Sequence, residues 1–301
     1  MILVVGATGT VGGQICRRLV EENQHVRALV RASSDAETVD ALKAAGIEIV
    51  PGDLRDGASL DAACRGVDAV ITTASAMPFR YIPGENDIKT TDRDGMLRLI
   101  GAAVAAGVSH FVYTSFSGNL ELASPLRDAK RTVEAALRAS TLRYTILRPS
   151  CFQEAWLSPV VGFDYPNAKA TIFGSGDRPV SYVASNDVAE FAVLSLTNPA
   201  AWNTALELGG PQAISQLEAM AIFERVGSRS FEVTHVPEEA LVAQAQAASD
   251  PLQQTFPTLM RCVAQGDPIP MEETVARIPV KLTSVTEYAE RVLGKVPATA
   301  G

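Results

Sequence analysis

Three glycines with regular spacing stand near the start of the chain. Gly6, Gly9 and Gly12 lie in the segment GATGTVGG, between the apolar run ILVV and a stretch with apolar residues at helical spacing. In a strand–turn–helix unit the first glycine makes the tight turn, the second lets the backbone approach a pyrophosphate, and the third lets the helix pack on the strand. The spacing therefore predicts a phosphate-binding turn.

The helix that follows this turn supplies the rest of the predicted phosphate site. Its unpaired backbone N–H groups and the positive end of its dipole stabilise a bound anion. Thr8 and Thr10 can add hydroxyl contacts, and Val11 lies within the same first turn. The alternative is a turn that merely requires glycine, but the order of strand, turn and helix favours a dinucleotide site.

The second predicted strand ends in VRALVRASS, which carries no acidic residue. An NAD site usually has Asp or Glu here, whereas Arg31, about 20 residues beyond the glycines, can bind a 2′-phosphate. Ser33 and Ser34 can add hydrogen bonds, so the residues favour NADP(H) over NAD(H), although Arg31 can also be simply solvated.

In the later segment GDLRD, Asp53 can bond the adenine amino group and Leu54 can pack on the adenine ring. Asp53 can equally be a helix cap.

The elements that must position these residues alternate along the first half of the chain. Short runs rich in Val and Ile alternate with amphipathic segments, as in a doubly wound parallel sheet. We expect strands at 2–5, 26–30, 47–50, 68–72, 110–114 and 143–148, and helices at 11–22, 35–45, 57–65, 91–106 and 128–139. The predicted fold class is α/β, with a Rossmann-type sheet.

Beyond Pro149 this regular alternation ends, since prolines and glycines interrupt short segments. We expect an NADP(H)-binding domain at 1–150 and a smaller, mostly helical substrate-pocket lobe at 151–301. Residues near 180–210 are expected to return to the main sheet, with a strand at 204–208. Helices are expected at 214–226, 238–248, 251–265 and 283–293.

Composition excludes several classes of protein. The 301 residues are 47% hydrophobic and carry a net charge of −8, which disfavours direct binding to nucleic acid or anionic lipid. The first residues enter the fold directly, and no apolar run reaches the roughly 18 residues of a membrane span. The dispersed cysteines predict reduced thiols in a cytoplasmic protein, and we expect a monomer or homodimer. The cysteines are Cys16, Cys64, Cys151 and Cys262.

Taken together, these segments resemble the NmrA-like, atypical branch of the short-chain dehydrogenase/reductases, which includes isoflavone-reductase-like and triphenylmethane-reductase-like enzymes. The resemblance covers nearly the whole chain and rests on GATGTVGG, the arginine of ALVR, GDLRD, AGVSHFVYTSF, LRPSCFQEAW and NDVAEFAV. It implies a nicotinamide across the carboxyl ends of the strands. The residues implied to lie beside it are Thr73, Ala74 and Ser75 on one side and Thr114, Ser115 and Phe116 on the other.

The usual catalytic set of this superfamily is incomplete in this chain. A Tyr and a Lys four residues apart normally share one helix face, so that the ammonium lowers the phenol's pKa. Lys130 is the candidate lysine, but Leu126 occupies the position of the tyrosine. The pair Tyr165 and Lys169 has the right spacing, but Pro166 and the irregular surroundings argue against an aligned helix. Lys130 is then either a group that orients the nicotinamide ribose, with or without protonating a substrate, or a surface lysine.

Other candidate side chains surround this position. Ser115, proposed with Lys130 as catalytic, and Thr114 can bond a substrate oxygen or the carboxamide, although strand ends often carry Ser and Thr for turn formation. An aromatic and apolar wall can hold a flat substrate, or be plain core. Its candidates are Met77, Phe79, Tyr81, Phe116, Phe152 and Trp156. The histidines lack metal-ligand spacing, and we expect no metal.

These residues favour an NADPH-dependent reductase that transfers hydride to a small conjugated or carbonyl-containing substrate, apolar or aromatic in character. The alternative is a redox-sensing regulatory protein that binds NADP(H) without turnover and acts through a protein partner. A sugar-nucleotide epimerase or dehydratase shares the fold but normally needs the absent tyrosine.

Overall fold

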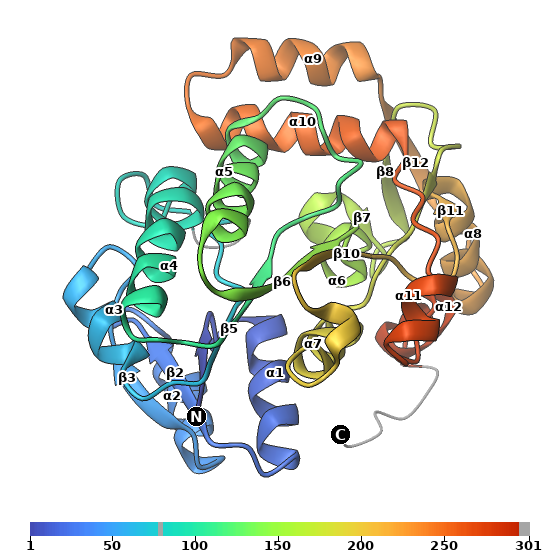
Figure 1. Cartoon of the computed structure of the whole chain (residues 1–301). Helices are drawn as coiled ribbons and strands as arrows, with labels where there is room; N and C mark the ends of the chain where they lie inside the picture. Colours follow the sequence, from blue (N-terminus) through green and yellow to red (C-terminus); the bar gives the residue numbers. More distant parts are fainter. Residues whose placement is uncertain (78–80, 295–301) are drawn as a thin grey trace. The chain divides into compact units, whose positions relative to one another are not determined.

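The computed structural model describes residues 1–77 and 81–294, and the chain forms two compact units. Unit 1 comprises residues 1–116, 125–148 and 188–206, and unit 2 comprises residues 117–124, 149–187 and 207–301. Figure 1 shows the course of the chain through both. Each unit therefore gathers segments that are far apart in the sequence.

The central sheet has seven strands in the order β10-β6-β5-β4-β1-β2-β3. Strands β1 to β6 pair in parallel, and β1 and β4 are buried along their whole length, as expected for strands covered by helices on both faces. The predicted α/β class is confirmed, and each predicted strand end falls within one residue of the observed end. The strands are β1 (Ile2–Val5), β2 (Val26–Val30), β3 (Glu48–Pro51), β4 (Ala69–Thr72), β5 (His110–Thr114), β6 (Arg143–Pro149) and β10 (Thr204–Leu208).

The five helices expected between the first six strands are present, one of them in a different form, whereas the helix that precedes β10 was not predicted. The segment predicted as one helix at 91–106 begins earlier, as a π-helix (Ile88–Gly95) that runs into α4. Asp87 and Thr90 form a capping box that fixes its start. In Figure 1, α3, α4 and α5 follow one another beside the strands. The helices are α1 (Thr10–Glu21), α2 (Ala36–Ala44), α3 (Gly57–Cys64), α4 (Met96–Ala105), α5 (Pro125–Ala139) and α7 (Ser185–Ser195).

Unit 2 contains the four helices expected beyond residue 210, together with two short helices, α6 and α11, and several short strands that were not predicted. The helices are α6 (Gln153–Trp156), α8 (Gln216–Gly227), α9 (Glu238–Ala247), α10 (Pro251–Gln265), α11 (Glu272–Arg277) and α12 (Val285–Val292). α9 and α10 pack side by side (Figure 1). The added strands form sheets β12-β8-β7 and β11-β9. They are β7 (Phe163–Asp164), β8 (Lys169–Phe173), β9 (Pro179–Val180), β11 (Ile214–Ser215) and β12 (Glu232–Val236).

A buried carboxylate anchors residues 117–124 within unit 2. Asp267 is fully buried, and its carboxylate accepts hydrogen bonds from Ser117 Oγ (2.7 Å), Asn119 Nδ2 (2.9 Å) and Ser150 Oγ (2.6 Å). A buried carboxylate is costly unless its oxygens are hydrogen-bonded. Asp267 therefore joins three separate stretches of the chain, although residues 117–124 follow β5 directly in sequence.

Candidate functional site

The glycine-rich turn after β1 has the shape that a phosphate site requires. Gly6 adopts φ +91°, and a Cβ there would lie 2.8 Å from Thr73 Oγ1 and 2.9 Å from the Ala74 nitrogen. A Cβ on Gly12 would lie 2.1 Å from the Gly6 carbonyl oxygen, so only glycine lets α1 pack this closely on β1. Gly9 is the N-cap of α1 and provides no side-chain hydrogen bond. The first N–H groups of α1 are thus left for an anion.

Two arginines and an aspartate lie at the carboxyl ends of β2 and β3. Arg31 follows β2 directly, and Arg55 donates from its backbone (2.8 Å), Nε (3.0 Å) and Nη2 (3.0 Å) to the Asp53 carboxylate. Partial burial would raise the pKa of Asp53, but hydrogen bonds and charge from Arg55, with a contribution from Arg31, lower it. Asp53 is therefore already engaged by Arg55. Leu54 is buried in the core against Gly95, which leaves its side chain little exposed for an adenine ring.

Lys130 forms a buried ion pair that the sequence did not predict. Its Nζ lies 3.1 Å from Asp92 Oδ1, and the side chains are 6% and 0% exposed. The other Asp92 oxygen accepts a hydrogen bond from the Ala76 backbone nitrogen (3.0 Å), just beyond β4. Nζ also lies 3.5 Å from the Thr114 carbonyl oxygen and 5.4 Å from the centre of the Tyr113 ring. The pair therefore lies where β4 and β5 end.

The position of this pair agrees with a general property of doubly wound sheets. Strands β2 and β3 lie on one side of β1 in the sheet, and β4, β5 and β6 lie on the other side. The strand order therefore reverses between β1 and β4. Ligands bind outside the carboxyl ends of the strands at such a point. Thr114 Oγ1 is buried and has no hydrogen-bond partner among the described residues, and the Thr73 backbone donates to the Val5 carbonyl oxygen (3.0 Å), next to Gly6. An unpartnered buried hydroxyl of this kind fits a group that contacts a ligand.

Ser115 has a structural partner. Its hydroxyl donates to the fully buried Glu134 (2.7 Å), and Glu134 also accepts from Arg131 (2.7 Å) and from Arg148 Nε (3.0 Å). Burial would raise the pKa of Glu134, but these hydrogen bonds and the arginine charges lower it. The Ser115 hydroxyl is thus committed to a buried carboxylate, which weakens its candidacy as a catalytic group.

The predicted wall residues fall into both units. Met77, Tyr81 and Phe116 belong to unit 1, and the Arg131 guanidinium lies 4.8 Å from the centre of the Phe116 ring. Phe79 lies outside the described residues. Phe152 and Trp156 belong to unit 2.

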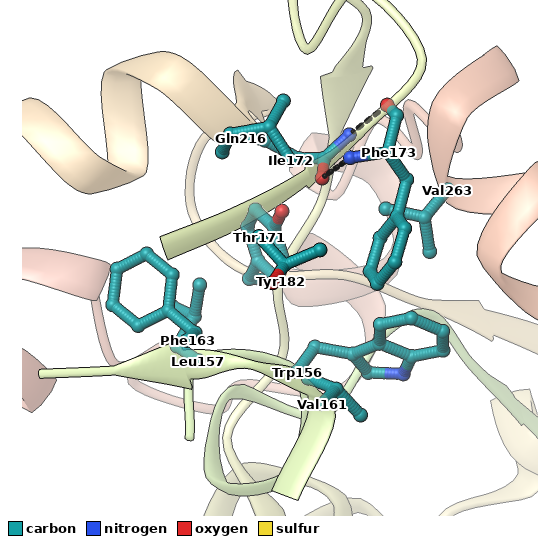
Figure 2. A pocket seen from close by; sticks show the side chains of 10 residues that line it. All are labelled: Trp156, Leu157, Val161, Phe163, Thr171, Ile172, Phe173, Tyr182, Gln216 and Val263. Carbon is teal, nitrogen blue, oxygen red and sulfur yellow. Dashed lines mark hydrogen bonds between the residues drawn. The ribbon is translucent and has the colours of Figure 1, made fainter. Parts of the chain in front are cut away.

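Trp156 lines a cavity within unit 2, which Figure 2 shows. Its volume is about 10 Å³, near the smallest that holds one water molecule. Gln216 faces the cavity but exchanges two hydrogen bonds with the Phe173 backbone (3.0 and 2.9 Å; Figure 2). A space this small does not accommodate an aromatic substrate.

The alternative tyrosine–lysine pair is not aligned for catalysis. Tyr165 packs on Phe223 in the core of unit 2, whereas Lys169 begins β8 and pairs with the exposed Glu232 (3.1 Å). The four cysteines are free and buried. No helix in residues 1–77 and 81–294 is long and apolar enough to cross a membrane, and the same residues contain no cluster of side chains suited to a metal ion.

Asp92 is the site residue that the sequence reading missed. In the sequence, its segment TTDRDG looks like the polar start of a helix. In the structure, the π-helix turns the Asp92 side chain inward. π-helical turns are rare and often occur at functional sites. Asp92 could have been recognised as an acidic residue at a position where the helical repeat calls for an apolar one.

Comparison with known proteins gives a consistent set of relatives. The sequence profile described as the NmrA-like family matches residues 1–289. The NAD(P)H azoreductase of Xenophilus azovorans is 32% identical over 231 residues, which cover 76% of this chain and 74% of that protein. The photosystem II assembly factor Ycf39 of Trieres chinensis is 31% identical over 238 residues, 78% of this chain and 72% of that protein. In fold, the chain is similar to Citrobacter sp. triphenylmethane reductase complexed with NADP(H), with TM-score 0.78, 22% identity and coverage of 97% and 99%.

Proposed function

Because this chain belongs to the NmrA-like family, we propose that it is an NADP(H)-dependent reductase acting on a small conjugated or carbonyl-containing molecule. The observation that carries the proposal is the buried pair of Lys130 and Asp92 at the ends of β4 and β5. A buried ammonium at the strand reversal is costly to maintain and is placed where a ligand binds in this fold. Relatives that include an azoreductase support the same reaction class.

The residues of unit 1 divide the binding of the cofactor among them. The turn at Gly6, Gly9 and Gly12 takes the pyrophosphate on backbone N–H groups, and Arg31 takes the 2′-phosphate. Thr73, Ala74 and Ser75 would hold one side of the nicotinamide, and Thr114, whose hydroxyl has no partner among the described residues, would hold the other. When bound, NADPH supplies the hydride. The protein supplies orientation and a site shielded from water.

Lys130 is the residue best placed to act on the reacting atoms. Its ammonium can donate a hydrogen bond to the ribose or to a substrate oxygen that gains negative charge. Tyr113 does not replace the absent phenol, because burial, with the charge of Asp92, raises its pKa well above the usual value and its side chain is fully buried. A proton for the product then comes from Lys130 or from water.

Turnover is the direct test of this function. We expect NADPH consumption, followed by its absorbance, with some member of a panel of quinones, enones, aryl aldehydes, azo compounds and triarylmethane dyes. Lys130→Met should lower kcat/KM by about 10- to 100-fold, since misplacing one polar contact at the reacting atoms costs this much. Lys169→Met, which removes the lysine of the unaligned pair, is the matched control and should leave kcat/KM unchanged. Equal activity of wild type and Lys130→Met would contradict the role of Lys130.

A second candidate is a regulatory or assembly protein that binds NADP(H) without consuming it. Relatives named as photosystem II assembly factors favour it, as does Leu126 in place of the usual tyrosine. Tight NADPH binding in a titration, combined with no turnover on any substrate of the panel, would select this function over the reductase.

A further inference from the structure

We propose that Asp92 is a positioning residue for Lys130: it holds the ammonium beside the strand ends while leaving it able to donate to a ligand. This inference rests on the proposed function for its chemistry. The partners of Asp92 and Lys130 named below all lie in unit 1.

The burial of the pair indicates that it serves more than stability. Asp92 is 0% exposed and Lys130 is 5% exposed. Removing two charges from water costs several kcal/mol per ion, and apolar replacements of buried pairs are often neutral or stabilising. A lysine needed only for packing would be better replaced by an apolar residue. The pair is therefore maintained at a cost, at the edge of the sheet where ligands bind.

The two oxygens of Asp92 have different tasks. Oδ2 accepts the Ala76 backbone N–H (3.0 Å) and so ties Asp92 to the segment that follows β4. Oδ1 lies 3.1 Å from Lys130 Nζ. The carboxylate thus fixes the distance between Ala76, after β4, and the Lys130 ammonium, on α5. A shift of Asp92 would move Ala76 and the ammonium together.

The contact with Lys130 is an ion pair without an aligned hydrogen bond. Asp92 Oδ1 is buried and accepts no hydrogen bond among the described residues, although the ammonium is 3.1 Å away. The contact from Nζ to the Thr114 carbonyl is long, at 3.5 Å. An ammonium has three N–H donors. Lys130 therefore donates one long hydrogen bond, to the Thr114 carbonyl, and is otherwise held by the charge of Asp92, which leaves donors of the ammonium for a ligand.

The π-helix explains how Asp92 comes to face inward. Its start is fixed by Asp87, whose carboxylate accepts from the Thr90 backbone (2.7 Å), while Thr91 donates to Asn86 (2.9 Å). Gly95 packs so closely on Leu54 that a Cβ would lie 2.8 Å from the Leu54 Cβ. These contacts fix both ends of the turn that carries Asp92.

Asp92→Asn tests the charge separately from the shape. Asparagine keeps an oxygen for the Ala76 N–H but leaves the buried Lys130 charge without a counter-charge, so the variant should be less stable than wild type. Circular dichroism at the assay temperature checks that it is folded. We expect kcat to fall about 10- to 100-fold, the cost of a misplaced reacting group, and the NADPH Kd to rise by a smaller factor. Asp94→Asn is the matched control: it removes a carboxylate from the same π-helix, but Asp94 pairs with Arg93 (2.7 Å) and not with Lys130. It should leave kcat unchanged.

A double-mutant cycle on NADPH binding gives a readout independent of turnover. In the Lys130→Met background, we expect Asp92→Asn to raise the Kd for NADPH no further, because the two side chains act as one unit. Additive losses in Kd, or an Asp92→Asn variant with wild-type kcat and Kd, would overturn the inference. If the two substitutions weaken NADPH binding non-additively and the protein turns over no substrate, the positioning role of Asp92 is supported and the reductase function is rejected.

Discussion

At the scale of single residues, backbone shape decides what the phosphate-binding turn can do. Gly6 is required for its positive φ and for its closeness to the Ala74 backbone nitrogen, and Gly12 is required because a Cβ there would meet only backbone atoms, which cannot move aside. Sequence spacing was enough to predict these glycines, since the steric requirement is local. It was not enough to predict Asp92, whose partners Ala76 and Lys130 are brought to it only by the fold.

Gly12→Ala should therefore damage folding as well as binding. The new methyl group would lie 2.1 Å from the Gly6 carbonyl oxygen, and we expect a loss of about 1–3 kcal/mol in the free energy of unfolding, with weaker NADPH binding. Gly13→Ala is the matched control, because its Cβ would come no closer than 3.4 Å to the Ala7 carbonyl oxygen. Thermal unfolding and NADPH titration of both variants are the measurements. Similar losses in both would show that the close contact at Gly12 is unimportant.

Arg31 should set the preference between the two nicotinamide cofactors. Arg31→Ala removes a charged hydrogen bond to the 2′-phosphate, worth about 1.5–3 kcal/mol, or about 10- to 100-fold in the Kd for NADPH. The Kd for NADH should hardly change, because NADH has no phosphate there. Titrations of both cofactors measure the effect. An equal loss for NADPH and NADH would place the 2′-phosphate elsewhere.

At the scale of elements, the sequence predicted repeating units well and irregular ones poorly. The parallel strands and their helices follow hydrophobic periodicity, so their ends were predicted closely. The π-helix was read as ordinary helix, because a wider turn leaves little trace in the pattern of apolar residues. Short strands such as β7 and β9 hold two residues each, too few for periodicity to reveal. One of these irregular elements, the π-helix, nonetheless carries Asp92.

At the scale of the whole molecule, one buried histidine links stability to pH. His110 is 3% exposed, its Nε2 lies 3.0 Å from Thr145 Oγ1, and burial, with the charge of Arg143, lowers its pKa from 6.5 to about 4. Between pH 6.5 and pH 4, this histidine binds a proton in the unfolded chain but not in the folded protein. The free energy of unfolding should thus fall as pH decreases from 6.5 to 4, by at most about 1.4 kcal/mol per pH unit from this group.

His110→Gln removes this titration while keeping a side chain that can hydrogen-bond to Thr145. We expect the loss of stability between pH 6.5 and 4.5 to be smaller in this variant than in wild type. Chemical denaturation at several pH values is the measurement. His25→Gln, at an exposed position, is the control and should show the wild-type dependence. An unchanged pH dependence in His110→Gln would mean that other groups dominate the acid response.

The division of the chain into units has a consequence for protein engineering. The chain passes between units at residues 116/117, 124/125, 148/149, 187/188 and 206/207. A fragment cut near residue 150 would lack α7 and β10, an edge strand of the sheet, and would keep residues 117–124 without the Asp267 that anchors them. A chimera that joins the front half of this protein to the back half of a relative should therefore fold only if the relative supplies an edge strand that pairs with β6 and a carboxylate that binds residues 117–124. New specificities are better sought by point substitutions than by exchange of halves.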